Sequence, residues 1–167
     1  MTDIASDNHS REKVAAALSS IVASSGLTVA KAVAAVLTGS LGLLSEAIHG
    51  LLDTGATVMT YFAVKIADQP ADDEHHYGHA KVESVAALAE TGLLFIASFW
   101  IISEAIQRIL GHGGAVEVNA VAIGVVVLSI AIDFFRARHL KKVAKATNSQ
   151  ALEADALHFS SDMWSSM

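Results

Sequence analysis

The sequence predicts an all-α fold, a polytopic bundle of transmembrane helices. Of its 167 residues, 53% are hydrophobic and only 17% are charged. The mean hydropathy of +0.48 is too high for an ordinary soluble domain of this size. Four apolar stretches of roughly 20 residues or more are each long enough to cross about 30 Å of hydrocarbon as a helix. The single proline, Pro70, follows the second stretch and marks a helix boundary there.

The elements follow from these stretches in order. A polar tail over residues 1–13 comes first, and it lacks the apolar core of a secretory signal. The four spans are expected over residues 14–37, 40–64, 85–106 and 116–135. A fifth helix is expected from Ala151, but it is too polar to be assigned as a span by hydropathy. We therefore expect an incomplete transmembrane domain over 14–167, with four complete spans and the start of a fifth.

Basic residues gather on one side of this topology. The tail and the links expected at 65–84 and 136–150 lie on the same side. On the opposite side, the only basic residue in the links is Arg108. The bases on the first side are Arg11, Lys13, Lys65, Lys81, Arg136, Arg138, Lys141, Lys142 and Lys145. By the positive-inside rule, the N-terminus and these links are expected to be cytoplasmic. Lys31, inside the first span, is expected to extend its ammonium to the membrane interface.

Composition excludes several classes of function. Cysteine is absent, so disulfides and thiolate metal sites are excluded, and any metal must be held by histidine and carboxylate. The net charge is −6, and no basic cluster is interleaved with aromatic residues. Both features argue against nucleic acid as a partner.

The second span carries His49 and Asp53 in the segment HGLLD, and the fifth helix repeats this spacing with His158 and Asp162 in HFSSD. Residues four apart on a helix project from one face. Two such faces in contact would offer two imidazoles and two carboxylates, a set that suits tetrahedral zinc and cancels the charge of a dication. One HxxxD pair in a soluble helix is more often a surface contact, but ionisable residues inside an apolar span usually bind something or line a pathway.

The link after the second span contains Asp72, His75 and His79, at spacings of three and four. These residues would share one face of a helix, although Pro70 and Gly78 favour a turn equally. The ligand types suit zinc in either conformation. The alternative is a solvated polar loop, and for the neighbouring His76 we keep that interpretation.

Other ionisable residues are weaker candidates. Glu46 and Asp155 each lie one turn before a histidine of the two pairs, where they could orient or hydrate the ligands. Glu90 and Asp133 lie in the third and fourth spans. Hydrogen bonding inside the bundle is at least as good an explanation for them as transport.

Three segments carry a resemblance to a known family: TGSLGLLSEAIHGLLD, QPADDEHHYGHAKVES and DALHFSSD. With them the chain resembles the cation diffusion facilitator family of zinc and related divalent-cation exporters over nearly its whole length. The resemblance implies a proton-coupled antiporter with six transmembrane helices and a C-terminal cytoplasmic domain, working as a homodimer by alternating access. It places the transport site on His49, Asp53, His158 and Asp162, and a second, cytoplasmic metal site on Asp72, His75 and His79.

The resemblance also bears on cargo and location. A histidine at the position of His49 is associated with zinc-selective members, which favours Zn2+ and leaves Cd2+, Co2+ or Fe2+ open as additional cargo. The sequence ends shortly after Asp162, so the rest of the family's transmembrane and cytoplasmic parts is not expected in it. The 136–150 link contains a single histidine, His139, and lacks the long histidine-rich insert of many eukaryotic relatives. A bacterial cytoplasmic membrane is therefore expected.

The prediction is therefore divalent-cation efflux by proton antiport, and no enzymatic activity. One alternative is a truncated membrane fragment that binds metal without transporting it. A second, less favoured, is a helical-bundle metalloenzyme, although such sites use more than two carboxylates and do not need four long apolar helices.

Overall fold

The computed structural model describes residues 2–73, 75–110 and 120–165. In this part of the chain it contains five helices and no strand, which confirms the expected all-α fold. The helices are α1 (Thr2–Thr38), α2 (Leu41–Ala67), α3 (Lys81–Ile109), α4 (Ala120–Thr147) and α5 (Gln150–Ser165).

Within the described residues, three helices are long and apolar enough to cross a membrane. The segments are Asn8–Thr38 of α1, Lys81–Ser103 of α3 and Ala120–Thr147 of α4. Helix α2, predicted as the second span, is not among them although it has 27 residues. Glu46, His49 and Asp53 lie within it and lower its hydropathy. These residues include half of the expected metal site, so a functional role explains their presence in a span. That α2 also crosses the membrane stays a prediction.

The predicted boundaries need three corrections. The tail is helical from Thr2, because α1 continues to Thr38 without a break. The link predicted over 65–84 is shorter, since α2 ends at Ala67 and α3 begins at Lys81. Most of the link predicted over 136–150 is helical, because α4 runs on to Thr147. The first residues of the predicted fourth span, 116–119, lie outside the described part of the chain.

Helix α4 extends through the basic stretch because that stretch is amphipathic. Ala137, Leu140 and Ala144 are buried on one face, whereas Arg138, Lys141, Lys142 and Lys145 are exposed. Asn148 then adopts a left-handed conformation with φ of 52°. The N–H of Ser149 donates to the carbonyl of Ala144 at 3.0 Å, which closes the helix C-terminus. The Ser149 hydroxyl accepts from the N–H of Leu152 and caps α5.

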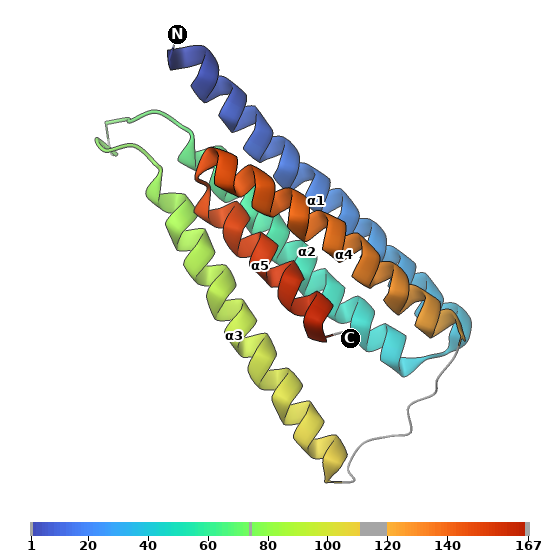
Figure 1. Ribbon diagram of the computed structural model, residues 1–167. Coiled ribbons are helices and arrows are strands. Elements are labelled where there is room, and N and C mark those ends of the chain that lie inside the picture. The colour runs from blue at the N-terminus through green and yellow to red at the C-terminus, as the bar shows by residue number, and fades with distance from the viewer. Residues whose placement is uncertain (1, 74, 111–119, 166–167) are drawn as a thin grey trace.

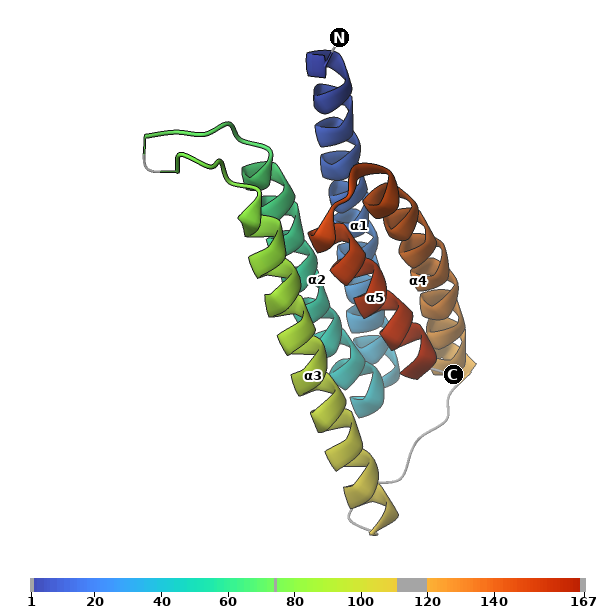
Figure 2. The same cartoon turned by 60° about the vertical axis from the view of Figure 1, so that its left-hand side comes forward.

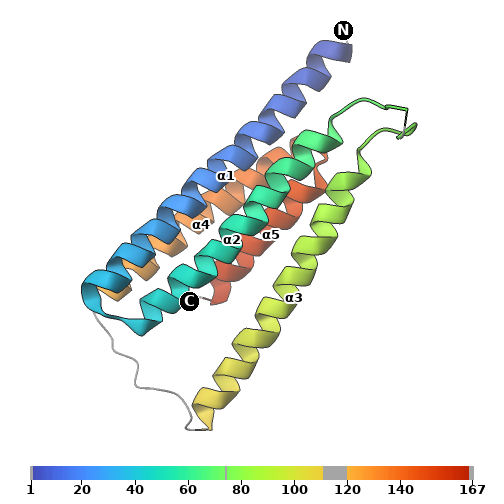
Figure 3. The ribbon, with the colours of Figure 1, turned by 180° about the vertical axis from the view of Figure 1, so that it is seen from behind.

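Helices α1, α2, α4 and α5 pack together, and α3 lies against α2 and α5 (Figure 1, Figure 2). The start of α1, the loop between α2 and α3, and the turn between α4 and α5 lie at one end of the bundle, as the view from behind also shows (Figure 3). Among the described side chains of α3, the buried ones are Glu83, Ala86 and Glu90, all in its first third. Helix α3 is therefore anchored near the loop end of the bundle.

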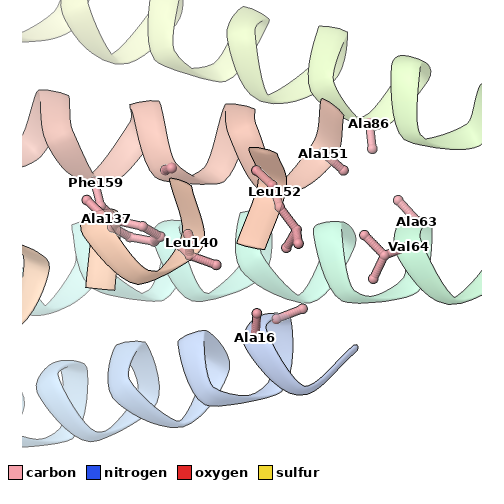
Figure 4. Packing of buried hydrophobic residues seen from close by; sticks show 12 residues of the cluster. Ala16, Ala63, Val64, Ala86, Ala137, Leu140, Ala151, Leu152 and Phe159 are labelled. Atoms are coloured by element: carbon pink, nitrogen blue, oxygen red, sulfur yellow. The ribbon is translucent and has the colours of Figure 1, made fainter. Parts of the chain in front are cut away.

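The apolar core is built mainly from small residues near that end. Figure 4 shows them converging from all five helices: Ala16, Ala63, Val64, Ala86, Ala137, Leu140, Ala151, Leu152 and Phe159. Alanines bring helix backbones close together. Farther along α2, Gly50 lies so near α1 that a Cβ there would be 2.6 Å from Thr28 Oγ1. Close α1–α2 packing therefore continues up to the predicted ligands.

Charged residues close the same end. The Lys13 ammonium is buried and contacts the carboxylates of Asp68 and Glu83, the latter at 3.0 Å. Glu83 also accepts hydrogen bonds from the Ser149 hydroxyl and the N–H of Ala151. These contacts join α1, α2, α3 and α5 where the loop between α2 and α3 begins and ends.

Candidate metal centre

The structure brings the two HxxxD pairs together, and we call His49, Asp53, His158 and Asp162 the helix site. Asp53 lies at its centre. Its Oδ1 is 3.1 Å from His158 Nε2 and 3.6 Å from His49 Nε2. Asp162 Oδ2 is 3.5 Å from His158 Nε2. One ligand atom each from His49, Asp53 and Asp162 also lie within 4.8 Å of one another. Residues more than 100 positions apart thus form one cluster between α2 and α5.

These separations suit a tetrahedral metal ion. Zinc bonds of about 2.0–2.1 Å place neighbouring ligand atoms of a tetrahedron about 3.4 Å apart. The three nitrogen–oxygen separations of the helix site, 3.1, 3.5 and 3.6 Å, bracket that value. His158 is buried, and within the described residues its Nδ1 has no hydrogen-bond partner.

The second cluster, Asp72, His75 and His79, is called the loop site. Asp72 again lies between two imidazoles, with Oδ1 at 3.1 Å from His75 Nδ1 and Oδ2 at 3.4 Å from His79 Nε2. Its segment is a turn, so the helical alternative for this stretch is wrong. The N–H of Gly78 donates to the His75 carbonyl at 2.9 Å, and Gly78 has φ of 75°. Glycine adopts this left-handed conformation without the steric cost of a Cβ.

Two of the weaker candidates have other partners. Lys31, expected to extend to the interface, is buried, and its Nζ lies 2.9 Å from Glu46 Oε2. Glu46 therefore pairs with a lysine of α1, beside the helix site. Glu90 is buried and accepts a hydrogen bond from the Thr60 hydroxyl, in keeping with the expected role inside the bundle.

Sequence reasoning missed a polar cluster next to the helix site. Arg136, assigned to a cytoplasmic link, is buried in α4, and its guanidinium lies over the Phe159 ring at 3.2 Å from the centroid. It hydrogen-bonds to Ser20 and Thr57, which both lie close to Asp155. Serine and threonine in an apolar helix give no signal that separates such a network from ordinary packing.

A model of a known protein family matches most of this chain. A model of the cation efflux transmembrane domain matches residues 17–167. The chain belongs to the cation efflux family. The family expected from the sequence motifs is thereby confirmed, and it is a family of membrane transporters rather than enzymes.

Individual relatives agree with this assignment. The chain is 36% identical over 148 residues to an uncharacterized transporter of Methanocaldococcus jannaschii, a match covering 89% of this chain and 52% of that protein. It is 33% identical over 131 residues to an uncharacterized transporter of Synechocystis sp., with 78% and 42% covered. It is 32% identical over 148 residues to the cation-efflux pump FieF of Salmonella paratyphi A, with 89% and 49% covered. The chain thus spans about half the length of the curated relatives it matches.

Proposed function

We propose that the chain carries the metal-translocating site of a divalent-cation exporter, with Zn2+ as the main cargo and protons as the counter-ion. The observation behind the proposal is the convergence of His49, Asp53, His158 and Asp162 from α2 and α5. Ionisable residues at membrane depth are costly and usually functional. Two neutral imidazoles and two carboxylates around a dication leave no net charge, which reduces that cost.

The donor set supports zinc. Imidazole nitrogen and carboxylate oxygen in a tetrahedral arrangement are ligands that zinc accepts readily. Co2+, Cd2+ and Fe2+ can use the same donors, so the proposal includes them as lesser cargo. Membership of the cation efflux family and likeness to the pump FieF support an export direction.

Protons are proposed as the counter-ion because metal and proton compete for the same atoms. Histidine and carboxylate ligands must be deprotonated to bind a metal. Histidine is the side chain most often used by proteins to respond to pH differences near neutrality, which suits a two-histidine site to coupling with a pH gradient. We further propose a homodimer in a bacterial cytoplasmic membrane, with the N-terminus and the loop site cytoplasmic. The distribution of basic residues supports this orientation.

Proteoliposomes containing the purified chain and a trapped zinc-sensitive dye test the proposal. With the lumen more acidic than the outside, external zinc should enter in exchange for protons, and dissipating the pH gradient should slow its entry. Asp162→Ala should abolish the uptake, whereas His76→Ala, which alters an exposed histidine outside both sites, should not.

Zinc uptake that ignores the pH gradient would contradict the antiport. Uptake that survives Asp162→Ala would contradict the site. If the chain binds zinc through Asp162 but moves none, the metal-binding alternative replaces transport for this chain.

A further inference from the structure

Four side chains, one each from α1, α2, α4 and α5, form a ring of polar contacts. They are Ser20 of α1, Thr57 of α2, Arg136 of α4 and Asp155 of α5, and all four are buried. We propose that this ring positions the helix site, by fixing α5 against α2 so that the two HxxxD pairs meet. The inference rests on the proposed function, since it concerns the geometry of the same metal site.

The ring consists of an arginine and an aspartate joined through two hydroxyls. Arg136 Nε donates to Ser20 Oγ at 2.6 Å, and the Ser20 hydroxyl donates to Asp155 Oδ2 at 3.2 Å. On the other side, an Arg136 terminal nitrogen donates to Thr57 Oγ1 at 3.0 Å, and that hydroxyl lies 3.3 Å from Asp155 Oδ1. Each oxygen of the Asp155 carboxylate thus lies near a hydroxyl from a different helix.

The ring is connected directly to both ligand pairs. Thr57 Oγ1 also lies 3.0 Å from the backbone carbonyl of Asp53, one turn earlier on α2, so its one hydroxyl proton has an acceptor both in the ring and at a ligand residue. Asp155 precedes His158 by one turn of α5. The Arg136 guanidinium covers the ring of Phe159, the residue next to His158. Any shift of α5 along α2 would therefore break the ring and separate His158 from Asp53.

The geometry requires the fork of an arginine. Its planar guanidinium directs two N–H groups toward α1 and α2 at the same time, which the single ammonium of lysine cannot reproduce. Burying a charged pair is costly and persists only where the surrounding contacts hold it. Asp133 contributes a further charge, since its Oδ1 lies 3.7 Å from the guanidinium. Such a ring is rigid, and rigidity is what a metal site assembled from two separate helices needs.

Cobalt binding tests the inference, because Co2+ accepts the same donors and its visible absorption reports coordination geometry. The parent for the test is the full chain with His79→Ala, which weakens the loop site. Thr57→Val and Ser20→Ala each remove one bridging hydroxyl, and Arg136→Lys removes the fork. Thr91→Val is the matched control, because its exposed hydroxyl donates to the carbonyl of Ala87 on the same helix.

We expect Asp53-dependent cobalt binding with strong tetrahedral bands in the parent and in Thr91→Val. The ring variants should bind about 10–100-fold more weakly, as is typical when partners of ligand residues are lost, with weaker tetrahedral bands. Circular dichroism identifies any variant that fails to fold, and Thr57→Val, which nearly preserves side-chain shape, is the decisive one.

Folded Thr57→Val and Ser20→Ala proteins with the parent's affinity and spectrum would overturn the inference, even if their thermal stability fell. Parent protein whose cobalt binding is unchanged by Asp53→Ala would instead overturn the proposed function. The two failures are therefore distinguishable.

Discussion

The helix site and the loop site use the same chemistry in opposite settings. In each, a carboxylate lies between two imidazoles, at 3.1 and 3.6 Å for Asp53 and at 3.1 and 3.4 Å for Asp72. The side chain of Asp53 is 14% exposed, however, and that of Asp72 is 53% exposed. The loop site comes from one short turn, whereas the helix site requires α2 and α5 to pack in register. Equal donors thus produce one site that depends on the whole fold and one that depends on a local segment.

The difference in exposure also changes how much each carboxylate gains in free energy from a charged partner. Exposed ion pairs contribute little because water screens them. Carboxylates partly removed from water depend more strongly on a partner. We therefore expect metal to stabilise the helix site and its bundle, and to affect the loop site mainly by ordering its turn.

The largest effect is expected from Asp162→Asn, which removes one of the two carboxylate charges of the helix site. Metal affinity there should fall by at least about 100-fold, since even loss of a ligand's hydrogen-bond partner often costs 10–100-fold. Competition with a chelating dye measures it. Asp73→Asn removes the same charge from the exposed loop and should leave the helix site unchanged. Equal losses in both variants would mean that net charge, not ligation, governs binding.

Acidification from pH 7 to pH 5.5 should weaken metal binding at both sites. Histidine must be neutral to ligate, so protons and metal compete for the same ring nitrogens at both sites. The sign is fixed, because protons displace metal as the pH falls. Zinc titrations at both pH values check this. Affinity that stays constant would rule out histidine ligation and, with it, the proposed coupling.

At the loop site, His79→Ala should reduce affinity about tenfold or more and leave the helix site intact. Of the two loop-site histidines, His75 and His79, His79 is the less exposed, and its Nε2 lies 3.4 Å from Asp72 Oδ2. His76→Ala, three residues away and exposed, is the control and should change neither site. Calorimetric titration of both variants would separate the sites. A fall in helix-site affinity in His79→Ala would show that the two sites are coupled.

The smallest effect is expected from Gly50→Ala, which crowds Thr28 and pushes α1 away from α2 beside His49. It should cost about 1–3 kcal/mol of stability, as overpacking usually does, and reduce helix-site affinity only several-fold. A Cβ at Gly55 meets nothing within 4 Å. Gly55→Ala should therefore keep or raise the thermal midpoint through its better helix propensity. Identical melting of the two variants would contradict the close α1–α2 contact.

Much of the fold could be predicted from the sequence because helical periodicity and apolar length are local properties. They indicate five helices and place both HxxxD pairs on helix faces. The end of α4 could not be predicted from charge alone, since its basic residues occupy only the exposed face and Leu140 and Ala144 hold the other face in the core. A charged stretch after an apolar span need not be a loop.

The candidate ligands could also be predicted, because histidine and aspartate at a spacing of four are conspicuous in an apolar helix. The partners of Lys31 and Arg136 could not. Lys31 pairs with Glu46 across two helices, and Arg136 binds hydroxyls from two others. Such contacts depend on how the helices rotate against one another, and that is determined by packing rather than by any spacing along the chain.

Calorimetric zinc titration of the detergent-purified chain and of Asp53→Ala at pH 7 tests the central claim most directly. Two sites built independently predict two binding events in the unmodified chain. The event assigned to the helix site should disappear in Asp53→Ala, while the loop-site event keeps its affinity and enthalpy. Two unchanged events in the variant would contradict the account, because Asp53 lies between His49 and His158 at the centre of the site.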